Sequence, residues 1–152
     1  MIIYFAISAG LISIISAFII RAGIAKKPRG NEKMIEISQA IEIGSKAYLK
    51  RQYKTISVVA IIIAVLLGAF FNLTTSLGFL IGAIASALAG YFGMLTSVMS
   101  NSRVAESAKQ GLSKAFRLSF LGGSVTGFLV AGMALFVVSV FWMFTKDINS
   151  LV

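Results

Sequence analysis

The stretch LGFLIGAIASALAGYFGMLTSVM, residues 77–99, carries no charged side chain. A helix needs about 20 consecutive apolar residues to cross the roughly 30 Å hydrocarbon core of a bilayer. Three similar runs lie at 2–20, 56–73 and 118–144, and all fourteen Lys and Arg and all five Asp and Glu fall outside the four runs. The sequence therefore predicts an all-α polytopic membrane bundle of four spans.

Composition supports a lipid environment for this chain. Apolar residues make up 58% of it and charged residues 12%, whereas ordinary globular domains are about half apolar and a quarter charged. The chain has no Cys and no His, which excludes disulfides, thiolate chemistry and the commonest general base. A net charge of +9 would suggest nucleic acid in a soluble domain. Here the cations flank apolar runs, so we predict a lipid bilayer and no nucleic acid as the partner.

Loop charges predict the orientation in the membrane. Nine Lys or Arg lie between Arg21 and Lys54, four lie in 100–117, and none lies in 72–76. Basic loops stay in the cytoplasm, so we expect the loops 21–55 and 100–117 inside and both ends of the chain outside. Residues 2–20 lack the basic start of a signal peptide and are interpreted as a retained span.

Breakers and caps divide the chain into helices. Pro28 and Gly30 end the first helix, and Asn31 has the character of an N-cap. From there the pattern predicts one helix over about 32–71, which projects into the cytoplasm before it enters the membrane. Residues 72–76 are expected to form a tight turn, and Gly111 is expected to stop the following helix.

Small residues recur along the third and fourth spans. Such stripes let helix backbones approach closely in lipid, so they predict contact with protein, either within this chain or in a larger assembly. The positions in the third span are Gly78, Gly82, Ser86 and Gly90, with Ala85, Ala89 and Gly93 beside them; those in the fourth span are Gly123, Gly127 and Ala131.

No residue of this sequence is assigned to catalysis, to a cofactor or to a metal. Residues 122–127 (GGSVTG) superficially resemble a phosphate-binding loop, but the Lys that follows such a loop is Phe128 here, so helix packing is the better interpretation. Glu32 and Glu36 are interpreted as solvated partners of Lys rather than as Mg²⁺ ligands. The cations of 46–54 are explained by lipid headgroups and orientation.

Two stretches resemble a known family. Residues 34–53, MIEISQAIEIGSKAYLKRQY, resemble a signature run of the membrane-integral pyrophosphatases, which are pyrophosphate-energised proton or sodium pumps. Residues 82–132 resemble a second block of that family, through SALAGYFGM at 86–94, NSRVAESA at 101–108 and FLGGSVTG at 120–127. Ser45 and Val104 depart from the family pattern, although neither change forbids a helix.

The resemblance implies that these four spans are the N-terminal, outer-ring portion of a sixteen-span bundle that works as a homodimer. The parent would hydrolyse pyrophosphate with Mg²⁺, with or without K⁺, and would export H⁺ or Na⁺. The family's Asp- and Lys-rich catalytic motifs do not occur in this chain, so the resemblance implies a structural and inactive portion that packs against the remaining helices.

Two other classes of function stay open at this point. One is a free-standing four-span membrane scaffold or accessory subunit, whose small-residue stripes would bind a partner or another copy. The other is a small transporter for an uncharged solute, which would use the hydroxyl groups of the first and fourth spans. The sequence leaves H⁺ against Na⁺ and the K⁺ requirement undecided.

Overall fold

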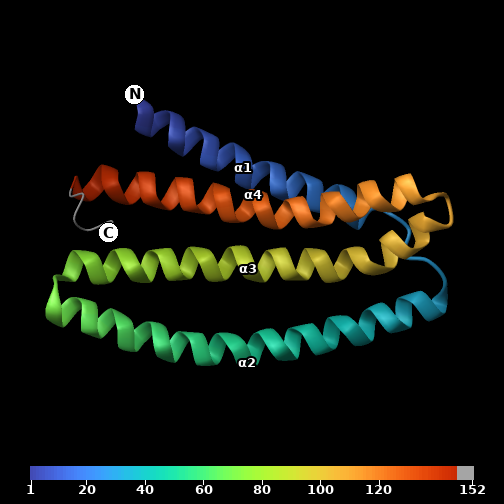
Figure 1. Ribbon diagram of the computed structural model, residues 1–152, viewed down its shortest axis with the longest axis horizontal. Coiled ribbons are helices and arrows are strands. Elements are labelled where there is room, and N and C mark those ends of the chain that lie inside the picture. Colours follow the sequence, from blue (N-terminus) through green and yellow to red (C-terminus); the bar gives the residue numbers. More distant parts are fainter. Residues whose placement is uncertain (147–152) are drawn as a thin grey trace.

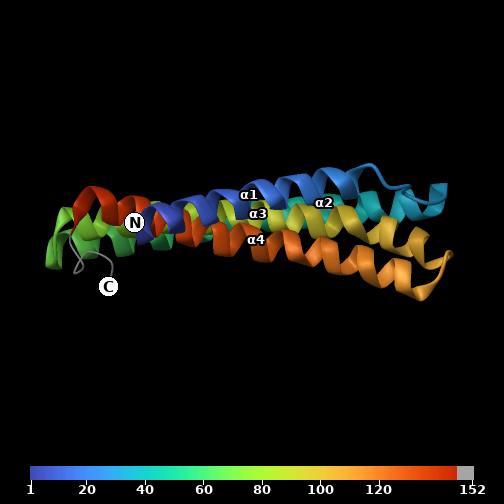
Figure 2. The ribbon, with the colours of Figure 1, turned by 90° about the horizontal axis from the view of Figure 1, so that it is seen from above.

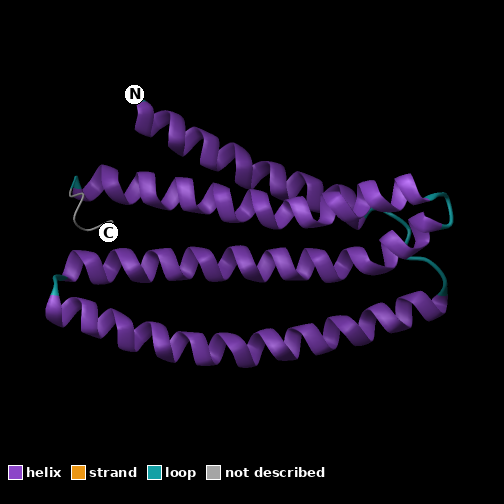
Figure 3. Cartoon of the chain, viewed as in Figure 1, coloured by secondary structure: helices purple, strands orange, loops and turns teal. Residues whose placement is uncertain are grey.

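The computed structural model describes residues 1–146, and these form four long helices joined by short connections (Figures 1 and 3). The helices are α1 (Ile2–Ala25), α2 (Glu32–Phe70), α3 (Leu73–Ala108) and α4 (Leu112–Thr145). Each is long and apolar enough to cross a membrane. The expected all-α class of membrane-spanning helices is confirmed.

The helices lie roughly side by side along one long axis. α3 packs between α2 and α4, and α1 packs on α4, which it crosses obliquely (Figures 1 and 2). The start of α1, the α2–α3 turn and the end of α4 lie at one end of the bundle, which we term the turn end (Figure 1). The connections 26–31 and 109–111 lie at the other end, which we term the basic end because Lys and Arg gather around it.

The N-termini of α2 and α3 use the same cap. Asn31 Oδ1 accepts a hydrogen bond from the Met34 N–H at 2.9 Å, and Asn72 Oδ1 accepts one from the Thr75 N–H at 2.8 Å. The Asn31 cap confirms the expected start of α2. The expected turn over 72–76 is wrong in its extent, because the Asn72 side chain satisfies an orphan N–H and lets α3 begin at Leu73.

Of the two other helix ends, one is confirmed and one differs. The first helix ends at Ala25, directly before the segment in which Pro28 and Gly30 were expected to break it. Gly111 does not stop α3 directly, because α3 ends at Ala108 with Lys109 as its C-cap. Instead Gly111 precedes α4 with a φ of +118°, a conformation that side chains with a Cβ rarely adopt.

Length explains why two helices extend beyond the bilayer. α2 has 39 residues and α3 has 36, which correspond to about 58 Å and 54 Å at 1.5 Å per residue. A hydrocarbon core of about 30 Å covers little more than half of that. Residues 32–55 of α2 and 100–108 of α3 lie outside the apolar runs 56–73 and 77–99 and stand at the basic end, where α2 begins and α3 ends.

The buried core is small and lies where α1, α3 and α4 meet. Its members are mostly aliphatic and come from all three helices: Ala17, Ile24, Ala89, Leu118, Val125 and Leu129. Most large apolar side chains are exposed instead, among them Ile61, Val65 and Phe70 of α2. Lipid tails solvate such side chains as well as a protein core does, so their exposure carries no penalty in a membrane.

The crossing of α1 over α4 brings the backbones of the two helices close together. A Cβ on Gly10 would lie 2.9 Å from the Gly132 carbonyl oxygen, and a Cβ on Gly132 would lie 2.9 Å from the Gly10 carbonyl oxygen. Beside this crossing the Ser13 hydroxyl donates to the Phe128 carbonyl at 2.9 Å. Two glycines and one interhelical hydrogen bond thus hold α1 against α4.

The small-residue stripes have a mixed outcome. Gly78 lies against the Phe141 ring, Gly93 lies against Thr126, and Ala89 is buried, so these positions contact protein as expected. A Cβ on Gly82, Gly123 or Gly127 would meet nothing within 4 Å. For these three, contact with protein outside this chain stays a prediction.

We expect Gly10→Ala to destabilise the bundle by about 1–3 kcal/mol, because the added methyl group forces the α1 and α4 backbones apart. The matched control is Gly23→Ala on the same helix, where a Cβ meets nothing within 4 Å. Alanine is the better helix former there, so the control should be neutral or stabilising. Thermal unfolding in a mild detergent measures both, and equal midpoints would contradict the crossing.

Candidate functional site

Arg103 of α3 makes the hydrogen bond that joins distant segments at the basic end. Only 8% of Arg103 is exposed. Its Nη1 donates to the Met99 carbonyl at 2.7 Å, and its Nη2 donates to the Ala25 carbonyl at 3.0 Å. Ala25 is the last residue of α1, so one guanidinium joins the end of α1 to α3.

Electrostatics favour this arrangement of Arg103. The last carbonyls of a helix have no partner within it, and they carry the negative end of the helix dipole. A cation that donates to the Ala25 carbonyl therefore satisfies an orphan acceptor and opposes the dipole. Burial lowers the pKa of the Arg103 guanidinium from its ordinary value, and the nearby positive charge of Arg29 lowers it further. The group nevertheless stays charged at neutral pH.

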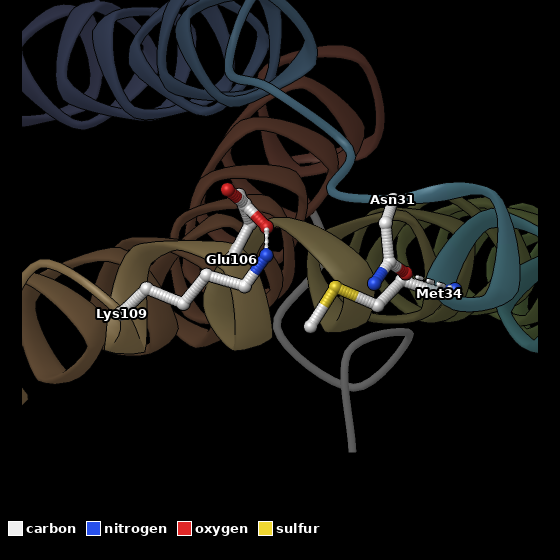
Figure 4. Close-up of polar contacts among 4 residues, drawn as sticks. All are labelled: Asn31, Met34, Glu106 and Lys109. Carbon is white, nitrogen blue, oxygen red and sulfur yellow. Dashed lines mark hydrogen bonds and ion pairs between the residues drawn. The ribbon is translucent and has the colours of Figure 1, made fainter.

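The connection from α1 to α2 is fitted closely against the end of α3. Gly30 has a φ of +89°, and a Cβ there would collide with the Met34 sulfur and lie 3.1 Å from Glu106 Oε2. The Glu106 carboxylate is 2.6 Å from Lys109 Nζ. Figure 4 shows this ion pair beside the Asn31 cap. Only glycine fits position 30 without strain or displacement.

Two hydrogen bonds join α2 to α3 within the bundle. The Tyr53 hydroxyl donates to the Ala87 carbonyl at 2.8 Å, and the Ser76 hydroxyl donates to the Ala64 carbonyl at 2.7 Å. Between them lies a groove of about 510 Å³, lined mainly by apolar side chains such as Ile63 and Phe79. The groove contains no acid or base, so it offers no chemistry of its own.

The residues that the sequence raised as alternatives do not form a reactive centre within 1–146. Residues 122–127 lie inside α4, where Gly122 faces the Ser100 side chain, as expected for helix packing. No group of three or more His, Cys, Asp or Glu that could hold a metal occurs among the described residues. They therefore do not fit a Mg²⁺ site, and no reaction step is derived from them. Asp147 lies outside the described residues.

The role of Arg103 was not predicted from the sequence, where this residue counted only as a cation of the 100–117 loop and as part of the resembling run 101–108. A usable signal was present, because Arg103 is a cation among small residues that allow close packing, from Ser100 to Ala105. What the sequence did not reveal is that the end of α1 lies against this segment.

Comparison with known proteins gives consistent matches. Residues 11–152 match the family model described as inorganic H⁺ pyrophosphatase. A K⁺-insensitive pyrophosphate-energized proton pump of Methanosarcina mazei is 45% identical over 95% of this chain and 22% of its own length. A K⁺-stimulated pyrophosphate-energized sodium pump of Thermotoga maritima is 41% identical over 82% of this chain and 18% of its own length. The chain thus spans about a fifth of the length of these curated relatives.

We expect Arg103→Lys to lower the stability of the bundle by about 2 kcal/mol. The Lys ammonium lacks the two separate nitrogens that donate hydrogen bonds to the Met99 and Ala25 carbonyls. Arg51→Lys, at an exposed position of α2, is the matched control and should change little. Unfolding in detergent, followed by the loss of helical circular dichroism, measures both variants. If the two lose the same stability, Arg103 does not join the helices.

Proposed function

The chain belongs to the family of inorganic H⁺ pyrophosphatases, and from this premise we propose that the protein containing it couples hydrolysis of pyrophosphate to the export of H⁺ or Na⁺. The observation that carries the proposal is the family match over 11–152, which includes α2, α3 and α4 and residues 11–25 of α1. The names of the relatives include both proton and sodium pumps. The transported ion therefore stays open in this proposal.

Within that protein, we propose that these four helices are a structural part of the pump. The apolar runs contain no Asp, Glu, Lys, Arg or His, whereas ion pathways through membranes normally use such a side chain. The described residues also offer no carboxylate cluster for a metal. The helices would instead support the remaining helices of the protein, which would supply the catalytic groups.

The cofactors and assembly are also proposals. Mg²⁺ would neutralise the charge of pyrophosphate when bound, at residues other than those described here. K⁺ would either stimulate the protein or leave it unaffected, since the names of the relatives include both cases. A homodimer is proposed for the intact protein. It is an integral membrane protein, and we propose a cell-membrane location.

Activity should require the whole protein. We expect the full-length protein, in membrane vesicles whose cytoplasmic face is outward, to release phosphate from pyrophosphate with Mg²⁺ and to take up H⁺ or Na⁺. Purified residues 1–152, shown by circular dichroism to be helical, should release none, because they lack the groups for the reaction. Parallel assays with and without K⁺ assign its role. Phosphate release by 1–152, or none by the full-length protein, would contradict the proposal.

The proposed orientation places the basic end in the cytoplasm and the turn end outside. The sequence has no native Cys, so a single introduced thiol reports its own side of the membrane. In intact cells, a membrane-impermeant maleimide should label Leu73→Cys at the turn end and should leave Lys27→Cys unlabelled. After permeabilisation both should react. The reverse pattern in intact cells would show that the bundle is inverted.

A further inference from the structure

Three arginines at the basic end lack a counter-charge within the described residues. They are Arg21 in α1, Arg29 in the connection that follows, and Arg103 in α3, and we term them the arginine cluster. The Nε atom of each is buried and has no hydrogen-bond partner. The two ion pairs found between described residues are Glu42–Lys46 and Glu106–Lys109. Neither pair involves an arginine of the cluster.

Each of these cations lies near Ala25, the last residue of α1, either along the chain or through a hydrogen bond. Arg103 donates to the Ala25 carbonyl, so its guanidinium lies at the end of α1. Arg21 precedes Ala25 by four residues, which is about one turn or 6 Å along the same helix. Arg29 follows Ala25 by four residues, and its charge acts on Arg103 strongly enough to lower the pKa of that group, after the larger effect of burial.

Such an arrangement is costly unless an anion completes it. Like charges that are held close and partly removed from water repel one another, and a buried charge is normally paired. The Glu106 carboxylate lies near Gly30 but is already 2.6 Å from Lys109 Nζ. The arginines therefore have donors without a partner, while the carboxylate near Gly30 is already paired with Lys109.

The depth of the cluster indicates which anion is available. Arg21 directly follows the apolar run 2–20, and Arg103 lies four residues, or about 6 Å, beyond the run 77–99. The polar headgroup layer on each side of the hydrocarbon core is about 5–8 Å thick. Both guanidinium groups therefore lie at the level of lipid phosphates, and arginine suits the oxygens of a phosphate group.

We propose that the arginine cluster is a binding site for the phosphate group of an anionic membrane lipid, such as phosphatidylglycerol. The phosphate accepts hydrogen bonds from the guanidinium groups of Arg21 and Arg29, which are partly exposed, and its charge offsets that of the buried Arg103 at the end of α1. The bound lipid thereby stabilises the basic end of the bundle. This site does not depend on the proposed pump activity.

Lipid retention by the full-length protein in a neutral detergent tests the site. In native mass spectrometry we expect the protein to retain added phosphatidylglycerol in preference to phosphatidylcholine. Arg29→Gln and Arg21→Gln should each weaken retention by about tenfold, as the loss of one charge-assisted hydrogen bond predicts. The two variants leave the Arg103 hydrogen bonds intact, so folding should survive. The matched control, Arg51→Gln, removes an exposed cation of α2 and should leave retention unchanged.

Several results would overturn the proposal. Equal loss in Arg29→Gln and Arg51→Gln would mean that general positive charge attracts the lipid. Equal retention of the two lipids would mean that the headgroup charge is not recognised. If inorganic phosphate raises the unfolding temperature of delipidated protein as much as phosphatidylglycerol does, the site binds a free anion instead. Absence of any retained lipid would mean that another part of the protein supplies the counter-charge.

Discussion

Removal of water from four long segments is the constraint on which this structure depends. Backbone polar groups that face hydrocarbon must find partners within their own segment, so each apolar run is helical. Lipid tails are as apolar as the side chains, so no hydrophobic force drives the helices together. Their association relies on close backbone approach, as at Gly10 and Gly132, and on isolated hydrogen bonds such as that from Ser13 to the Phe128 carbonyl.

The same constraint moves the polar groups to the ends of the helices. Charged side chains are absent from the apolar runs. At the basic end, polar side chains bind the terminal backbone groups that have no partner within the helices. Arg103 supplies donors to the terminal carbonyl of α1, and Asn31 supplies an acceptor to the first turn of α2. The connection between the two helices is thereby fixed against α3, which carries Arg103.

The exposed faces relate the bundle to its longer relatives. Gly82, Gly123 and Gly127 have open space where a side chain would be, and most of the length of the relatives has no counterpart in this chain. Small residues on an open helix face leave room for another helix to approach. This pattern is compatible with a bundle that supports further helices, and it gives those helices a face on which to pack.

The sequence by itself determined the helices and most of their ends. The four apolar runs were located as stretches without charged residues. The break between α1 and α2 was predicted from Pro28, Gly30 and Asn31. It also indicated the family, through runs that lie within the matched residues 11–152. These features are local, because a span, a cap or a breaker depends on neighbouring residues along the chain.

The tertiary structure alone decided which faces meet. In water, an apolar stripe marks the buried side of a helix, but helices that are apolar all round give no such signal. The crossing of Gly10 with Gly132 was therefore missed, and part of the Gly123 stripe, expected to contact protein, is open within this chain. The sequence likewise showed that Arg103 is charged. Only the packing of α1 along α4 brought the Ala25 carbonyl within its reach, because that contact joins segments 78 residues apart.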